Sequence, residues 1–96
     1  MGQRAERIFR INDEIAALRR DEYLAFEELV MLGHLDDDAR RNAAVSGSLI
    51  DAADARESAG DVARMERHVR ALRAARERLE HQRDQMLDKL SVSVVE

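Results

Sequence analysis

The chain has no cysteine and no proline, and its 96 residues include only two Phe and one Tyr. Without cysteine, neither disulfide bonds nor thiolate metal ligands are available. With so few aromatic residues, a core must be built from Leu, Ile, Val, Met and Ala. Charged residues make up 38% of the chain, and this composition is typical of long helices or coiled coils. What is missing therefore predicts an all-α protein.

Long apolar runs are also missing. No stretch has the length of a membrane-spanning helix. The first residues, MGQRAE, lead into a charged segment that lacks the apolar centre of a signal peptide. We therefore expect a cytoplasmic protein that does not bind membranes. Lys89 is the only lysine among the 16 basic residues, a bias that favours a GC-rich bacterial source.

A first long helix is predicted over about residues 3–32. Apolar residues alternate at three- and four-residue spacing, which is the pattern of a coiled-coil seam; they are Ile8, Ile11, Ile15, Leu18, Ala25, Leu29 and Leu32. Gly33 follows the last of them and is a suitable C-terminal cap. Glu22 is the only interruption of this seam.

A second long helix is predicted over about residues 59–90. Ser58 and Asp61 have the spacing of a capping box, which opens a helix. A narrower seam follows, again at three- and four-residue spacing, and consists of Val62, Met65, Val69, Leu72, Leu79, Met86 and Leu90. Arg76 and Arg83 interrupt it. In an antiparallel hairpin Arg76 falls at the level of Glu22, so we expect these two side chains to form a structural polar pair.

The segment between these helices, about residues 36–57, is predicted to hold short helices. Ser48 and Asp51 form a second capping box. The acidic run Asp36–Asp38 suits a helix N-terminus, where side-chain carboxylates accept backbone hydrogen bonds. The tail, residues 91–96, is rich in β-branched residues and is expected to leave the helix. Residues 1–96 are thus predicted to form a single helical domain.

The first helix carries more apolar surface than one partner helix covers. Between Tyr23 and Leu32 only Glu27 and Glu28 are charged, and a helix that is apolar nearly all round is normally buried from several sides. The middle segment is expected to cover part of this surface. The rest predicts a partner or dimer interface at Tyr23, Leu24, Phe26, Val30 and Met31, with two hairpins forming a four-helix bundle.

Catalysis, metal binding and nucleic-acid binding are each weakly supported. There is no Gly-rich phosphate loop, nucleophile elbow or Cys–His pair, so we expect no enzyme and no cofactor. His34 with Asp36–Asp38 resembles neither a di-iron motif nor a calcium loop. The arginines from Arg64 to Arg76 recur every third residue and wind around the helix, with Glu66 among them and Glu77 and Glu80 after them. A phosphate-binding face needs concentrated, uncompensated positive charge.

The sequence therefore predicts a non-enzymatic helical protein–protein interaction module, a small bacterial regulator or adaptor that binds itself and another protein. In topology alone, the acidic run between two helices is similar to the acid-tipped coiled-coil fingers of transcript cleavage factors. In those fingers an Asn and a Tyr follow the acidic tip, and this chain has no such pair after its acidic run. Transcription is one process in which such a regulator would act. The alternative is a structural or assembly subunit, such as a phage or oligomer-building accessory protein. A bundle that binds metal through carboxylates and His is the minor alternative.

Overall fold

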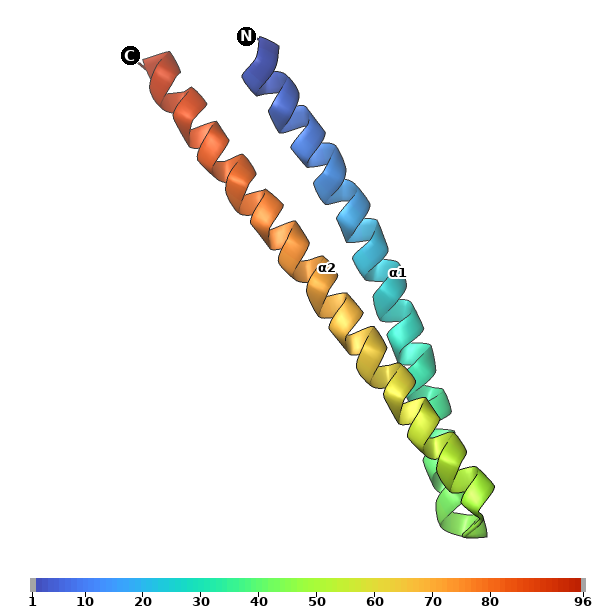
Figure 1. The fold of residues 1–96 in the computed structure, drawn as a ribbon. Coiled ribbons are helices and arrows are strands. Elements are labelled where there is room, and N and C mark those ends of the chain that lie inside the picture. Colours follow the sequence, from blue (N-terminus) through green and yellow to red (C-terminus); the bar gives the residue numbers. More distant parts are fainter. Residues whose placement is uncertain (1, 96) are drawn as a thin grey trace. The chain divides into compact units, whose positions relative to one another are not determined.

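The computed structural model describes residues 2–95, with the side chains of residues 2–91. Within this range every residue except Gly47 and Ser48 is α-helical, and no strand is present. Helix α1 spans Gly2–Ser46 and helix α2 spans Leu49–Val95 (Figure 1). The predicted all-α class with two long helices is confirmed.

The chain divides into two compact units, each containing a piece of both helices. Unit 1 consists of Met1–Glu22 and Ala71–Glu96, and unit 2 is Tyr23–Arg70. Within unit 1 the helices run antiparallel, because Asn12 contacts Arg83 while Glu22 contacts Arg76. Unit 2 is itself a helical hairpin, because it contains the turn between α1 and α2.

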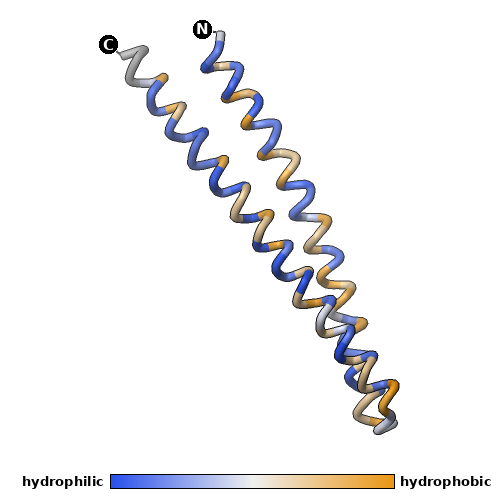
Figure 2. Tube along the Cα trace, viewed as in Figure 1, coloured by the Kyte–Doolittle hydropathy of each residue, from blue (hydrophilic) through white to orange (hydrophobic). Residues whose placement is uncertain are grey.

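A narrow apolar seam joins the helices within each unit. In unit 1 the buried apolar residues are Ile8, Ile11 and Ile15, and in unit 2 they are Ala25 and Val69. Three- or four-residue steps keep side chains on one face of a helix. Figure 2 shows the hydrophobic positions recurring along both helices between hydrophilic ones. The seams read from the sequence are therefore those that the two helices bury.

The prediction that the first helix ends at Gly33 is wrong, because α1 continues to Ser46. Gly33 lacks the positive φ angle of a C-terminal cap. The heptad spacing passes through it and continues at Asp36, Ala39 and Ala43, which are buried or half-buried. A glycine inside a helix costs about 1 kcal/mol relative to alanine, a cost that continued packing offsets.

The predicted short helices of residues 36–57 are absent as separate elements. Residues 36–46 extend α1, and α2 begins at Leu49 rather than near residue 59. Ser58 lies inside α2, where it is half-buried and continues the spacing of the seam. Its Ser-x-x-Asp pattern opens no helix because the chain on both sides of it is packed as helix.

The turn between the helices consists of Gly47 and Ser48. Gly47 has a φ of 64°, a left-handed conformation that favours glycine, and its N–H donates to the Ala43 carbonyl at 3.0 Å. The Asp51 N–H donates to Ser48 Oγ at 3.0 Å, as expected for an N-cap. The helix start predicted at Ser48 is thus confirmed, and Ser48 caps the whole of α2. The reciprocal bond of a capping box is not formed, because the Ser48 N–H donates to Ser46 Oγ at 3.1 Å instead of to Asp51.

The prediction that the tail leaves the helix is wrong for residues 91–95, because α2 extends to Val95. Glu96 lies outside the described residues. β-branched residues lower helix propensity by only tenths of a kcal/mol each, and an existing helix grows without a new nucleation cost. Neither helix contains, over the residues described, a stretch long and apolar enough to cross a membrane.

Candidate functional site

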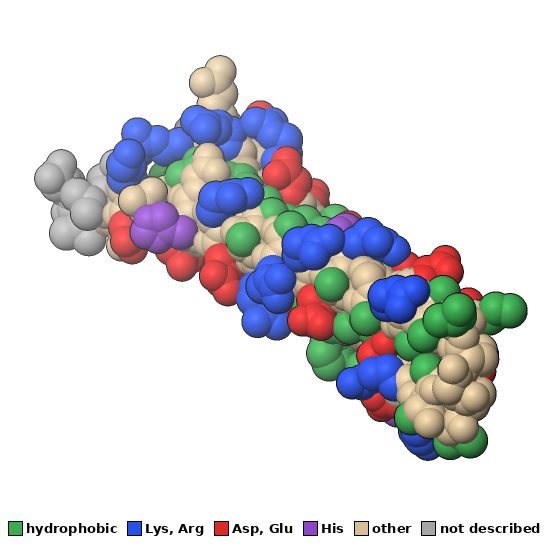
Figure 3. All heavy atoms as spheres, turned by 60° about the horizontal axis from the view of Figure 1, so that its bottom comes forward, with side chains coloured by type: hydrophobic (Ala, Val, Ile, Leu, Met, Phe, Trp, Pro, Cys, Tyr) green, Lys and Arg blue, Asp and Glu red, His purple; other side chains and the backbone are tan. Residues whose placement is uncertain are grey.

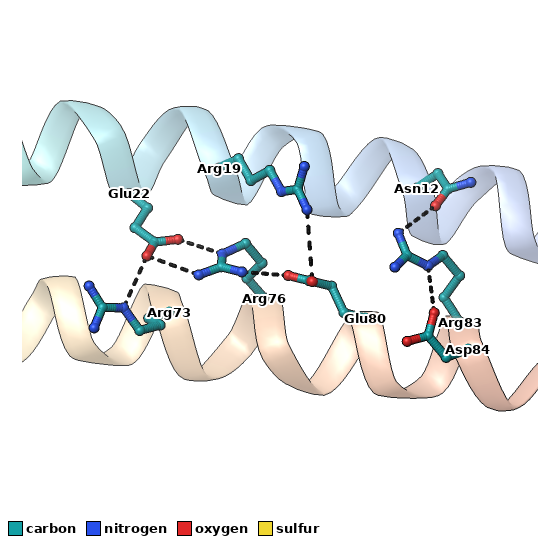
Figure 4. Close-up of polar contacts among 8 residues, drawn as sticks. All are labelled: Asn12, Arg19, Glu22, Arg73, Arg76, Glu80, Arg83 and Asp84. Carbon is teal, nitrogen blue, oxygen red and sulfur yellow. Dashed lines mark hydrogen bonds and ion pairs between the residues drawn. The ribbon is translucent and has the colours of Figure 1, made fainter.

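The polar pair expected from the interrupted seams is in direct contact within unit 1. Arg76 Nε donates to Glu22 Oε2 at 2.6 Å and Arg76 Nη2 to Glu22 Oε1 at 3.2 Å (Figure 4). The Arg76 side chain is 20% exposed and the Glu22 side chain 15%. The arrangement is the two-pronged geometry that a planar guanidinium forms with a carboxylate.

This pair belongs to a larger network that crosses between the two helices of unit 1. Arg73 Nε lies 3.3 Å from Glu22 Oε1, and Arg76 Nη1 donates to Glu80 Oε1 at 2.5 Å. Glu80 Oε2 in turn lies 3.8 Å from Arg19 Nη2 of α1. Figure 4 shows the alternating acidic and basic side chains between the two helices. Each charged group at this level of the seam therefore has an opposite charge beside it.

The network changes the acidity of its members. The hydrogen bond from Arg76 holds the pKa of the Glu22 carboxyl below 4.5, Arg73 adds to this effect, and partial burial opposes it. The hydrogen bonds to Glu22 and Glu80 raise the pKa of Arg76. All of these groups are engaged with one another, so the network is a structural feature of the seam.

Asp36 is a seam residue that the sequence analysis placed at a helix N-terminus. It lies inside α1 and is 8% exposed. Its Oδ2 is 3.2 Å from Arg40 Nε, while its buried Oδ1 has no hydrogen-bond partner among the described residues. Asp37 pairs with Arg40 and Asp38 with Arg41. The pattern that identifies these pairs in the sequence is the three- and four-residue spacing between the acidic run and the two arginines.

The described residues contain no assembled set of ligands that would support the metal-binding alternative. No group of three or more His, Asp or Glu side chains is close enough together there to hold a metal ion. The two acids nearest Arg40 point their carboxylates at its guanidinium instead. These ion pairs stabilise α1 as ordinary side-chain pairs on one helix.

The five residues predicted as an interface are all exposed in unit 2. Their exposed fractions are 63% for Tyr23, 63% for Leu24, 52% for Phe26, 46% for Val30 and 62% for Met31. Figure 2 shows hydrophobic positions close together along this part of α1. A monomer thus leaves uncovered the surface that the sequence assigned to a partner.

The expected cover from the middle segment is absent. Leu49 is 88% exposed and Ile50 75% exposed, because they begin α2 rather than a short helix folded over α1. Val45 and Leu35 are exposed as well. Figure 3 shows hydrophobic side chains at the surface around the end of unit 2 that carries the turn. The exposed apolar surface of unit 2 is therefore larger than the sequence analysis predicted.

The exposed apolar residues of α1 between Tyr23 and Leu35 lie in two stripes, one on each side of its seam. The Tyr stripe is the seam shifted forward by one residue and consists of Tyr23, Phe26, Val30 and Gly33. The Met stripe is the seam shifted back by one residue and consists of Leu24, Glu28, Met31 and Leu35. Because each residue turns a helix by about 100°, each stripe faces about 100° away from the contact with α2.

A shallow groove lies between the two helices of unit 2 and adjoins the Met stripe. Its volume is about 440 Å³, and it is lined by Glu28, Leu32, Asp61, Arg64, Met65 and His68. Leu32 and Met65 are apolar, and the other lining residues are polar or charged. Arg64 is hydrogen-bonded to Asp61. A groove lined by both apolar and charged side chains suits the side chain of a protein partner.

Comparison of this chain with protein-family models, with curated proteins and with solved structures finds no match.

Proposed function

We propose that this chain is a non-enzymatic protein–protein interaction module that acts as a small bacterial regulator or adaptor on another protein. The supporting observation is the exposure of five large apolar side chains within residues 23–31 of α1. Contiguous apolar surface of this kind on a small protein usually marks an interaction site. The seam of unit 2 does not account for these residues, because Ala25 already fills it at this level.

The same surface supports self-association. Each of the two stripes lies about 100° around the α1 axis from the seam that contacts α2. A further helix therefore fits against a side of α1 that α2 does not cover. Two hairpins joined in this way form a bundle of four long helices. Two-fold dimers are the commonest oligomers of soluble proteins, and we propose a homodimer in the cytoplasm as the working form.

A comparative pull-down from a lysate of the source organism tests the adaptor role. Leu24→Glu/Met31→Glu places two carboxylates on the Met stripe. Phe9→Glu/Leu87→Glu is the matched control, because it adds the same charge at two exposed apolar residues of unit 1. We expect bound proteins to be lost with the first variant and kept with the second. Identical captures by wild type and both variants would refute the adaptor role.

Light scattering at micromolar concentration tests the assembly. A defined dimer is the expected result. Growth beyond a tetramer as the concentration rises would instead favour the structural subunit, because such a subunit presents surfaces that do not close on themselves.

A further inference from the structure

The two stripes of α1 differ in charge, and this difference decides which of them suits a second copy of the chain. From Tyr23 to Gly33 the Tyr stripe contains no charged residue. The Met stripe has Glu28 between Leu24 and Met31. Burying an unpaired carboxylate in an interface is costly. The Tyr stripe is therefore the better candidate for a fully buried contact.

We propose that the Tyr stripe binds the same stripe of a second copy, with the two α1 helices antiparallel. Phe26 lies against the partner's Val30 in this arrangement, and Tyr23 lies over the partner's Gly33. The two-fold axis repeats both contacts. The inference rests on the proposed function, because it takes the exposed face of α1 as a binding surface. It adds that a second copy of the chain occupies this surface and that Phe26 pairs with the partner's Val30.

Shape supports this register. A Cβ added at Gly33 would meet no atom within 4 Å, so there is open space above this residue. Tyr23 is the largest side chain of the stripe and is 63% exposed. The antiparallel register places this large ring over the one residue without a side chain. A parallel pairing would place two Tyr23 rings side by side and two Gly33 residues together, leaving a void.

Charge supports the same register. Glu27 and His34 lie on one edge of the Tyr stripe, four residues after Tyr23 and Val30 respectively. Side chains on a helix lean toward its N-terminus. With the helices antiparallel, Glu27 and the partner's His34 therefore lean toward each other, and the carboxylate can accept a hydrogen bond from the imidazole. A parallel two-fold pairing would set the Glu27 edges of the two helices on opposite sides of the contact, so that Glu27 would have no His34 of the partner beside it.

The Met stripe fits a second copy less well. Its antiparallel self-pairing would match Leu24 with the partner's Leu35, but it would also place Glu28 against the partner's Met31. The two-fold axis would bury two carboxylates in this way, without a cation on either stripe to pair with them. The Met stripe and the adjoining groove are thus left for a different protein.

Cysteine cross-linking tests the register, because the chain contains no cysteine of its own. Phe26→Cys chains are mixed with Val30→Cys chains and oxidised with glutathione disulfide. A cross-linked heterodimer is expected in the mixture and not with either variant alone. A mixture of Leu24→Cys and Leu35→Cys is the matched control for the Met stripe. Cross-linking of this control in place of the first mixture would overturn the proposal.

Gly33→Lys tests the contact beneath Tyr23. Lysine has a higher helix propensity than glycine, so the helix content of the chain at low concentration should be unchanged or higher. The added side chain fills the space that Tyr23 of the second copy needs. We expect the dimer dissociation constant to rise more than about tenfold. Gly60→Lys, which adds the same charge to α2, should change it less than about threefold.

These results separate the inference from the adaptor role. Equal effects of Gly33→Lys and Gly60→Lys, or a monomeric wild type, would overturn the inference. The pull-down that compares Leu24→Glu/Met31→Glu with its control would then still decide the adaptor role. A dimer with the expected cross-link but no captured protein would support the inference and count against the adaptor role.

Discussion

Arg76 donates two hydrogen bonds to the carboxylate of Glu22, from Nε at 2.6 Å and from Nη2 at 3.2 Å, at a level where both helices of unit 1 would otherwise bury apolar side chains. Arg76 has a second acidic partner in Glu80 at 2.5 Å. Loss of Glu22 would therefore leave the guanidinium paired. This redundancy allows the contribution of Glu22 to be measured by replacing it.

Glu22→Leu should leave the free energy of unfolding unchanged or raise it by up to about 2 kcal/mol, because half-buried ion pairs often gain little over apolar packing. Urea titration monitored by circular dichroism measures this change. Glu77→Leu, at an exposed position of α2 in the same unit, should stay within about 0.5 kcal/mol of wild type. A loss of several kcal/mol for Glu22→Leu would show that the pair stabilises the fold.

Glu22→Gln should reduce stability at neutral pH and have progressively less effect in acid. Arg76 lowers the pKa of Glu22 below 4.5 in the folded chain. The stability that this provides is complete above the unfolded pKa and is lost as the pH falls through the lowered pKa. Urea titrations at about pH 6 and about pH 3 should show the difference between wild type and variant shrinking. A difference that is constant with pH would contradict this explanation.

A pair of glycine substitutions tests where α1 ends. Gly33 lies in open space with an ordinary helical backbone, so Gly33→Ala should raise the free energy of unfolding by about 0.5–1 kcal/mol. Gly47 has a φ of 64°, so Gly47→Ala should lower it by about 1–2 kcal/mol. Thermal or urea melts of the two variants, at a concentration where the chain is monomeric, measure these changes. Destabilisation by Gly33→Ala together with stabilisation by Gly47→Ala would instead place the helix end at Gly33.

The sequence predicted the contacts of large apolar side chains in the seam, of the charged pair that interrupts it and of the helix cap. Regular spacing identified the buried Ile8, Ile11 and Ile15, and interruptions at one level identified the Glu22–Arg76 contact. Ser48 was identified as a helix cap from its spacing to Asp51. The five exposed residues of α1 stood out because they exceed what one partner helix covers, and their occupant stays a prediction.

The helix ends near the turn were missed for one physical reason. The seam there is continued by Asp36, Ala39 and Ala43 in α1 and by Ser58 in α2. These residues are small or polar, so their periodicity is weak in hydropathy although they occupy the same face. Gly33 and Ser58 then resembled stop and start sites. Helix continuity was decided instead by the packing of two chain segments that the turn at Gly47 brings together.

Asp36→Ala should raise the free energy of unfolding by about 1 kcal/mol, because a buried acceptor without a partner is costly. Asp36 Oδ1 is such an atom, and the ion pair lost with it involves Arg40, whose side chain is 64% exposed. Asp37→Ala is the control, since the side chain of Asp37 is 50% exposed and should contribute little. Destabilisation by Asp36→Ala in a urea melt would show that the carboxylate is required at this level.

Tyr23 offers a direct probe of the exposed face of α1, because it is the only tyrosine in the chain. A hydrogen bond to the Glu27 carboxylate raises the pKa of Tyr23 above 10.0, and repulsion between this carboxylate and the tyrosinate acts in the same direction. An ultraviolet absorbance titration at a concentration where the chain is monomeric should show this shift. Glu27→Gln should return the pKa towards 10.0, since an amide neither repels the tyrosinate nor favours the phenol as strongly. Glu28→Gln is the control, because Glu28 belongs to the Met stripe on the other side of the seam from Tyr23. Loss of its charge should leave the titration of Tyr23 unchanged. Equal midpoints in all three proteins would show that Tyr23 points away from Glu27.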